Sequence, residues 1–148
     1  MIMEIRRTGP LDISALITLL ASMHKEAEIT LTPIDSDKLI TVINTVIHRG
    51  VSFVAVTDDN SIAGSIGGET GFDWWSTSPF LSDYWFYVDP EQRNSSAAVR
   101  LAKQFVETGK EANVPVRIGH IFSGDLERKD KFYERLGFVR VGSTFVEK

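Results

Sequence analysis

A strand that runs directly into a strongly amphipathic helix is the feature that most restricts the fold of this chain. Ser82–Val88 is dense in aromatic residues, and the segment stops at Asp89-Pro90, because proline cannot donate to a strand ladder. From about Ser95 to Ala112, apolar residues recur at helical spacing with charged residues between them. A strand followed by a crossover helix predicts a mixed sheet in an α/β or α+β domain.

The other segments extend this pattern to the order β-α-α-β-β-β-α-β-α-β. Helical periodicity predicts two early helices, the first capped by Asp12 and the second capped by Asp35 or Ser36 and stopped by Gly50. A short later helix is predicted to end at Gly137. That later helix is predicted at Glu127–Leu136, and strands are predicted at Met3–Thr8, Val51–Thr57, Ser61–Gly68, Val114–Phe122 and Phe138–Val146. Glu69–Pro79 is predicted to be a loop, and its aromatic residues are unusual for a purely solvated connection.

The composition restricts the number of domains, the cellular compartment and the kinds of ligand that this chain is expected to have. A chain of 148 residues with 43% hydrophobic residues fits one domain, 1–148, and no apolar run approaches the roughly 18 residues needed to span a bilayer. The absence of cysteine excludes disulfides and thiolate metal sites, and we expect a cytoplasmic protein. A net charge of −4 with dispersed basic residues argues against nucleic-acid binding. His24, His48 and His120 lack paired ligand spacing, so no metal site is expected.

The turn between the strand and the helix predicts an anion site. The first four backbone N–H groups of a helix lack partners within the helix, and the positive end of the helix dipole lies there. Small residues lead into this helix start, so a diphosphate can approach the backbone closely. Arg93 can add a charge-assisted contact.

At these residues the sequence resembles the GNAT acetyltransferase superfamily. The superfamily signature is a strand that ends V-x-P, followed by Arg or Gln, two residues, Gly, one residue, and Gly or Ala. The matching residues here are Val88, Pro90, Arg93, Ser96 and Ala98, with Ser96 in place of a glycine. A second block, Lys131–Phe138 (KFYERLGF), looks like the late F/L-Y-E-x-L-G-F block of the same superfamily.

The resemblance implies a GNAT-like fold with acetyl-CoA as the acyl donor and an amine as the acceptor. The amine attacks the thioester directly in a ternary complex, and a backbone N–H near Val88 holds the oxyanion. Tyr133 takes the place of the tyrosine that protonates the departing sulfur in many relatives, a role that a phenol within hydrogen-bond reach can fill. The residues that the resemblance places against the coenzyme are Tyr87, Val88, Arg93, Asn94, Ser95, Ser96, Ala97 and Ala98.

The general base is not decided by the motifs. Relatives often carry an acid about four residues before the strand-ending valine, where this chain has Tyr84 with Asp83 beside it. Asp83 and Glu69 are therefore candidates, and His120 on the neighbouring predicted strand is a third, because imidazole accepts a proton near neutral pH. The substrate ammonium group can also lose its proton to bulk water before it binds.

Two further alternatives stay open. Trp74, Trp75, Tyr84 and Trp85 can line an acceptor pocket, since aromatic faces attract cations, or they can belong to the core or to a homodimer contact. The chain can also be a noncatalytic acyl-CoA-binding or protein-interaction module on the same fold, an alternative motivated by Asn94 and Ser96 at positions where glycine is expected. The acceptor itself is not specified by the sequence.

Overall fold

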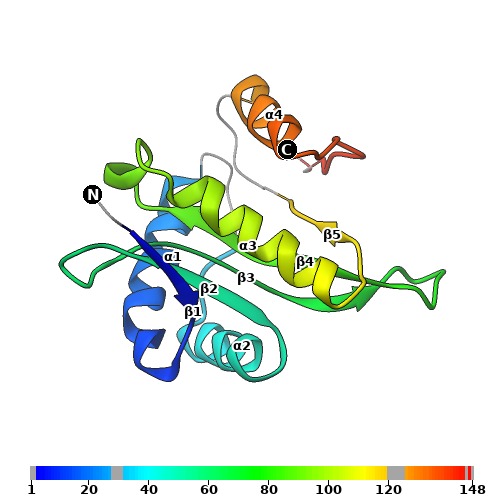
Figure 1. Cartoon of the computed structure of the whole chain (residues 1–148). Helices are drawn as coiled ribbons and strands as arrows, with labels where there is room; N and C mark the ends of the chain where they lie inside the picture. Colours follow the sequence, from blue (N-terminus) through cyan, green and yellow to red (C-terminus); the bar gives the residue numbers. More distant parts are fainter. Residues whose placement is uncertain (1–2, 28–31, 120–125, 146, 148) are drawn as a thin grey trace.

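A five-stranded mixed sheet forms the centre of the molecule (Figure 1). The computed structural model describes residues 3–27, 32–119, 126–145 and 147. The strands lie in the order β1-β2-β3-β4-β5, and all neighbours are antiparallel except β4 and β5, which are parallel. Their bounds are β1 Glu4–Arg7, β2 Val51–Val56, β3 Ile62–Phe72, β4 Pro79–Val88 and β5 Val116–Arg117.

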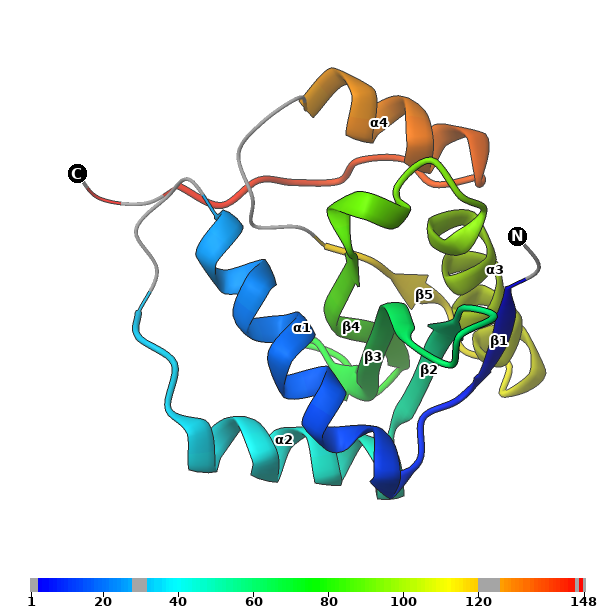
Figure 2. The same cartoon turned by 90° about the vertical axis from the view of Figure 1, so that its left-hand side faces the viewer.

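Helices cover both faces of this sheet (Figure 2). One face carries α1 and α2, which pack with Trp85 and Tyr87 of β4. The other face carries α3, whose Leu101 and Phe105 are fully buried against β2, β3 and β4. The helices are α1 Ile13–Glu26, α2 Ser36–Arg49, α3 Ala97–Glu111 and α4 Leu126–Arg135, with short 3-10 helices at Pro10–Asp12 and Pro90–Gln92. None of the described helices is both long and apolar enough to cross a membrane.

The predicted order of elements is confirmed as far as α4, with one hairpin longer than expected. The predicted loop Glu69–Pro79 is wrong at both ends, because β3 continues to Phe72 and β4 begins at Pro79. Glu69 pairs with Ser82 and Phe72 with Pro79, so backbone pairing overrides the weak strand propensity of glycine and polar residues. Only residues 73–78 connect the two strands.

The predicted last strand, Phe138–Val146, is wrong over the residues that the structure describes. Residues 138–145 form no strand, and Val139, Val141 and Phe145 are more than three-quarters exposed. A strand needs a neighbour with free backbone groups. The β5 ladder contains only two residue pairs, and no described strand borders this segment. The predicted strand Val114–Phe122 shrinks to Val116–Arg117, and its residues 120–122 lie outside the described residues.

Asp12 precedes α1 as predicted, but its side chain does not cap that helix. The carboxylate accepts two hydrogen bonds from the Arg6 guanidinium, at 2.7 and 2.9 Å, and one from the Gly9 backbone N–H at 2.7 Å. These bonds tie β1 to the start of α1 and, with the hydrogen bond from Arg6 as the main cause, lower the pKa of Asp12. By contrast, Asp35 caps α2 as predicted and accepts from the Lys38 N–H at 2.9 Å.

Replacing Asp12 by Asn should lower the free energy of unfolding by about 2 kcal/mol at neutral pH, because Arg6 loses a charged, nearly buried partner. A carboxyl group whose folded pKa is lowered stabilises the fold above its unfolded pKa of about 4 and loses this effect as the pH falls further. Urea unfolding at neutral pH and at about pH 3 measures both effects. Asp58→Asn in the exposed turn after β2 is the control. Equal unfolding free energies for the two variants at neutral pH would contradict the prediction.

Candidate active site

A β-bulge in β4 reverses which face its side chains occupy. Gly67 pairs with Trp85 and Gly68 pairs with Asp83, so Tyr84 is an extra residue without a partner on β3. A side chain on Gly68 would meet the Ser82 carbonyl oxygen at 1.8 Å, so the bulge requires glycine on the opposite strand. As a result, Tyr84 and Trp85 lie on the α2 face, while Asp83 lies on the face that carries α3.

The sheet opens between β4 and β5 immediately beside this bulge. The ladder ends where Ser82 pairs with Arg117. Two residues later, the Gly119 N–H donates to Oδ1 of the Asp83 side chain at 2.9 Å. A side chain therefore occupies the position where a strand backbone would otherwise continue the ladder. Among the described residues, the β4–β5 ladder therefore ends just before Asp83.

Asp83 and Tyr133 are brought together at the opening, although 50 residues separate them in the sequence. Burial raises the pKa of Asp83 to about 6. Burial, and then the charge of Asp83, raise the pKa of Tyr133 above its ordinary value. At neutral pH the site therefore holds an ionised carboxylate, which can accept a proton, and a protonated phenol, which can donate one.

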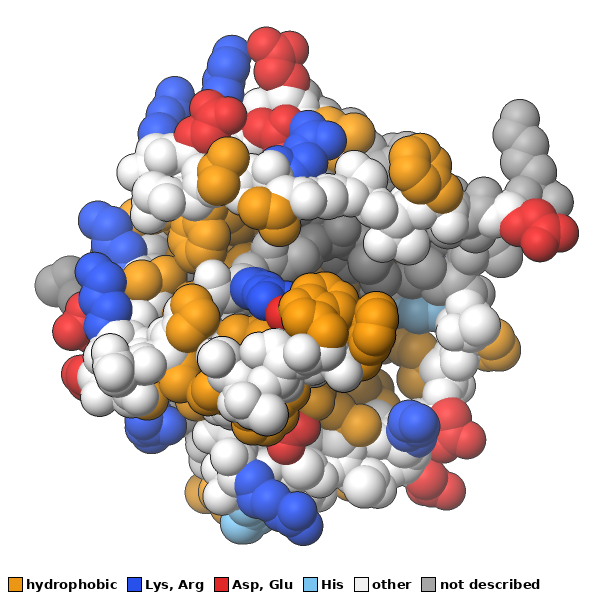
Figure 3. Space-filling view, turned by 90° about the vertical axis from the view of Figure 1, so that its right-hand side faces the viewer, with side chains coloured by type: hydrophobic (Ala, Val, Ile, Leu, Met, Phe, Trp, Pro, Cys, Tyr) orange, Lys and Arg blue, Asp and Glu red, His pale blue; other side chains and the backbone are white. Residues whose placement is uncertain are grey.

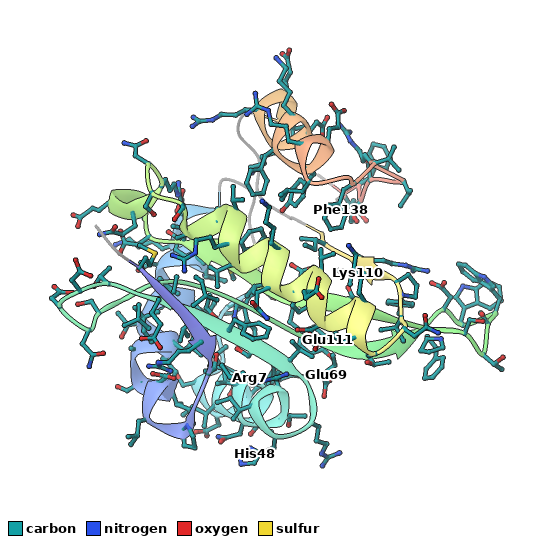
Figure 4. The ribbon with its side chains drawn as sticks, viewed as in Figure 1. Arg7, His48, Glu69, Lys110, Glu111 and Phe138 are labelled. Carbon is teal, nitrogen blue, oxygen red and sulfur yellow. The ribbon has the colours of Figure 1, made fainter. Side chains whose placement is uncertain are left out.

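Aromatic packing positions Tyr133. Phe132 on α4 lies 6.3 Å from Phe86 of β4, measured between ring centroids, and this contact holds α4 over the sheet. Tyr133 makes edge-to-face contacts with Phe132 at 5.2 Å and with Phe138 at 5.9 Å. Phe138 lies on the side of α4 that faces α3 (Figure 4). Gly137, with a φ of +91°, lies in the turn between the end of α4 and Phe138. The apolar residues of the late motif thus orient its tyrosine.

The turn from β4 to α3 contains the residues predicted to contact the coenzyme. Ser95 Oγ donates to the Gln92 carbonyl and accepts from the Ala97 N–H at 3.2 Å, and Ser96 caps α3 by position without a side-chain hydrogen bond. Ala97 is fully buried, and Asn94 is exposed. Small side chains therefore surround the first turn of α3, where backbone N–H groups lack helical partners. This arrangement fits a diphosphate group.

Glu26 already binds Arg93. The Arg93 guanidinium donates to both carboxylate oxygens of Glu26, at 2.7 and 2.8 Å, while its Nε donates to the Val88 carbonyl at 3.1 Å. The Tyr87 hydroxyl donates to the same carboxylate. The hydrogen bond from Arg93 lowers the pKa of Glu26, whereas burial and then Glu26 raise the pKa of Tyr87 to about 12. No local sequence pattern indicates Glu26, because it lies 67 residues before Arg93, at the end of α1.

The remaining predicted residues occupy different places. Glu69 lies on the α2 face, where its carboxylate accepts a hydrogen bond from the Tyr84 hydroxyl at 2.6 Å. Trp85 is a core residue, and its Nε1 donates to Ser65 Oγ at 2.9 Å. Trp74 and Trp75 lie in the tip of the β3–β4 hairpin, 92% and 67% exposed, on the end of the molecule where hydrophobic side chains gather (Figure 3). His120 lies outside the described residues.

A pocket of about 350 Å³ lies between α3 and α4. Lys103 and Lys110 of α3 and Arg135 of α4 supply three cationic side chains to its lining, and Glu107 supplies one acidic side chain. Figure 4 shows Lys110 on the C-terminal half of α3. The space between these helices is therefore suited to an anionic group.

The element order and the mixed sheet, whose last pair β4 and β5 is parallel and only two residue pairs long, define an α+β fold class. The chain belongs to the acetyltransferase (GNAT) family, which its sequence matches over residues 17–138. The enzyme class is thus an acetyltransferase, as the resemblance implied. No curated protein matches the sequence.

Solved structures share the fold at low sequence identity. An aminoglycoside 6′-N-acetyltransferase in complex with a bisubstrate analogue has a TM-score of 0.77 at 16% identity, with 100% of this chain and 98% of the other covered. A predicted acetyltransferase with acetyl-CoA from Clostridium acetobutylicum has a TM-score of 0.76 at 18% identity, with 99% and 96% covered. An aminoglycoside 6′-N-acetyltransferase from Acinetobacter baumannii has a TM-score of 0.74 at 18% identity, with 99% and 97% covered.

Proposed function

We propose that this protein transfers an acetyl group from acetyl-CoA to a primary amine by direct attack of the amine. The observation that carries the proposal is the Asp83 carboxylate at the opening between β4 and β5, near enough to Tyr133 for its charge to raise the pKa of that phenol. Asp83 accepts the proton that the amine loses, and Tyr133 donates a proton to the departing sulfur. Acetyl-CoA supplies the activated acyl group, held by the first turn of α3 and by Arg93.

The choice of Asp83 as the base follows from its position. Asp83 lies at the opening and on the same face as Tyr133, whereas the Glu69 carboxylate is hydrogen-bonded on the α2 face. A pKa of about 6 lets Asp83 be ionised at neutral pH and still return its proton readily. Glu69 is therefore available for another role.

The test is a thiol-release assay with acetyl-CoA and a panel of amines, combined with calorimetry of acetyl-CoA and free CoA. Amino sugars belong in the panel, because structurally similar proteins are acetyltransferases of aminoglycosides and of glucosamine-6-phosphate. Micromolar coenzyme binding with amine-dependent thiol release would support the proposal. Coenzyme binding without release for any amine would instead favour a noncatalytic acyl-CoA-binding module. A lack of coenzyme binding up to millimolar concentration would overturn both functions.

Arg93→Ala should weaken acetyl-CoA binding by about 10-fold, because a charge-assisted contact to phosphate is lost. Glu26→Gln should strengthen binding by about 3-fold, since Arg93 must leave a partly exposed ion pair to reach the coenzyme, and such pairs are worth less than about 1 kcal/mol. Calorimetry with acetyl-CoA measures both changes.

The controls are Arg49→Ala at the end of α2 and Glu111→Gln at the end of α3, which alter charge at exposed positions. Neither control should change the affinity for acetyl-CoA. If Glu26→Gln weakens binding, then the Glu26–Arg93 pair supports the coenzyme site instead of competing with it.

A further inference from the structure

A second pocket lies on the α2 face of the sheet. It has a volume of about 250 Å³ and is lined by Val42 and Thr45 of α2, Glu69 of β3 and Tyr84 of β4. One acidic side chain thus faces a partly apolar pocket. In Figure 4, Glu69 lies where β3 passes α2.

Contacts on two sides hold Glu69 in place. The Tyr84 hydroxyl donates to its Oε2 at 2.6 Å, and this bond raises the pKa of Tyr84, so the phenol remains a donor. The Glu69 stem packs over Gly50, where an added Cβ would approach Glu69 Cγ at 3.0 Å. The side chain is half-buried, and no arginine, lysine or histidine of the described residues forms an ion pair with it.

A carboxylate in this position has unused acceptor capacity. It offers about four lone-pair sites, and a single tyrosine hydroxyl satisfies one of them. The Thr45 hydroxyl donates to the Thr41 carbonyl, so it can still accept a hydrogen bond from a ligand. The pocket therefore offers a negative charge and hydrogen-bond acceptors, which suit a ligand nitrogen that carries both a positive charge and N–H donors.

The bulge places a pocket residue and the proposed base at consecutive positions of β4. Asp83 and Tyr84 are consecutive residues, yet the Asp83 carboxylate bonds to Gly119 at the opening and the Tyr84 hydroxyl bonds to Glu69 in the pocket. Consecutive Cα atoms are about 3.8 Å apart. The two side chains thus leave neighbouring positions of β4 toward opposite faces, so an acceptor that reaches both has to pass the end of the β4–β5 ladder.

We infer that the acceptor is a diamine or a larger polycation, and that Glu69 and Tyr84 bind a second nitrogen that stays protonated while the first is acetylated. This inference rests on the proposed function. The two carboxylates then have different roles. Asp83 removes a proton from the reacting amine, and Glu69 binds the cation that does not react.

Kinetics with diaminobutane and butylamine, matched in carbon chain length, test the inference. The wild-type protein should show a kcat/KM about 5- to 10-fold higher for the diamine, because one hydrogen-bonded charge contact is added. In Glu69→Gln the ratio of the two kcat/KM values should fall to about 2, the statistical value for a molecule with two equivalent amines. Tyr84→Phe should lower the ratio by a smaller factor, and Glu111→Gln should keep the wild-type ratio. An unchanged ratio in Glu69→Gln would overturn the inference.

Calorimetry of diaminobutane in the presence of free CoA separates this inference from the proposed function, since it needs no turnover. Binding that is weakened about 5- to 10-fold in Glu69→Gln, but not in Glu111→Gln, would support the pocket even if no amine were acetylated. Acetylation of butylamine and diaminobutane with kcat/KM values that differ by no more than the statistical factor of about 2 in the wild-type protein would overturn the pocket's role and leave the proposed function intact.

Discussion

Asp83→Asn should lower kcat/KM by about 100-fold or more with any amine acceptor, because the variant removes the group that takes the proton from the amine. In the wild-type protein, kcat/KM should rise as the pH increases through about 6, where Asp83 ionises. In the variant, kcat/KM should lose this rise and should increase with pH only where the acceptor amine loses its proton. Steady-state kinetics between about pH 5 and 9 measure both effects.

The stability of Asp83→Asn provides the control for this experiment. A carboxyl group whose folded pKa is raised destabilises the fold as the pH rises from its unfolded pKa of about 4 through about 6. The amide of Asn can still accept the hydrogen bond from Gly119. The Tm of Asp83→Asn at neutral pH should therefore equal or exceed that of the wild-type protein. A stable variant with unchanged kcat/KM would show that the amine loses its proton to bulk water or to another group.

Tyr133→Phe should lower kcat by about 10- to 100-fold and leave the affinity for acetyl-CoA unchanged. The substitution keeps the ring, and with it the contacts to Phe132 and Phe138, and removes only the hydroxyl. The raised pKa keeps that hydroxyl protonated across the physiological range, so the wild-type residue is ready to donate a proton.

Measurements of kcat and of acetyl-CoA affinity on the same preparation separate catalysis from binding. A fall in acetyl-CoA affinity with an unchanged kcat would assign the Tyr133 hydroxyl to coenzyme binding. A thioester with a more acidic thiol offers a second check. Its departing sulfur needs less protonation, so the effect of Tyr133→Phe should become smaller.

The ion pair between Glu26 and Arg93 could not be predicted from the sequence. The Val88–Ala98 motif predicts that Arg93 binds phosphate, and the acidic residues near Arg93 in the sequence, Asp89 and Glu91, are not the ones that bind it. The carboxylate belongs to Glu26 at the end of α1, and the strands β2 and β3 lie between α1 and Arg93 along the chain. A contact over 67 residues exists only once the sheet has brought both segments together.

The sequence by itself determined the family, the strand-to-helix turn at Val88–Ala98 and the position of Tyr133 on a late helix. These features depend on periodicity and on short motifs, which are local properties of a chain. Only the tertiary structure separates Asp83 from Glu69 in space. The bulge at Tyr84 places the two carboxylates on opposite faces of the sheet, and it forms only when β4 pairs with the glycines of β3. Strand register is a property of two segments together, so neither segment encodes it alone.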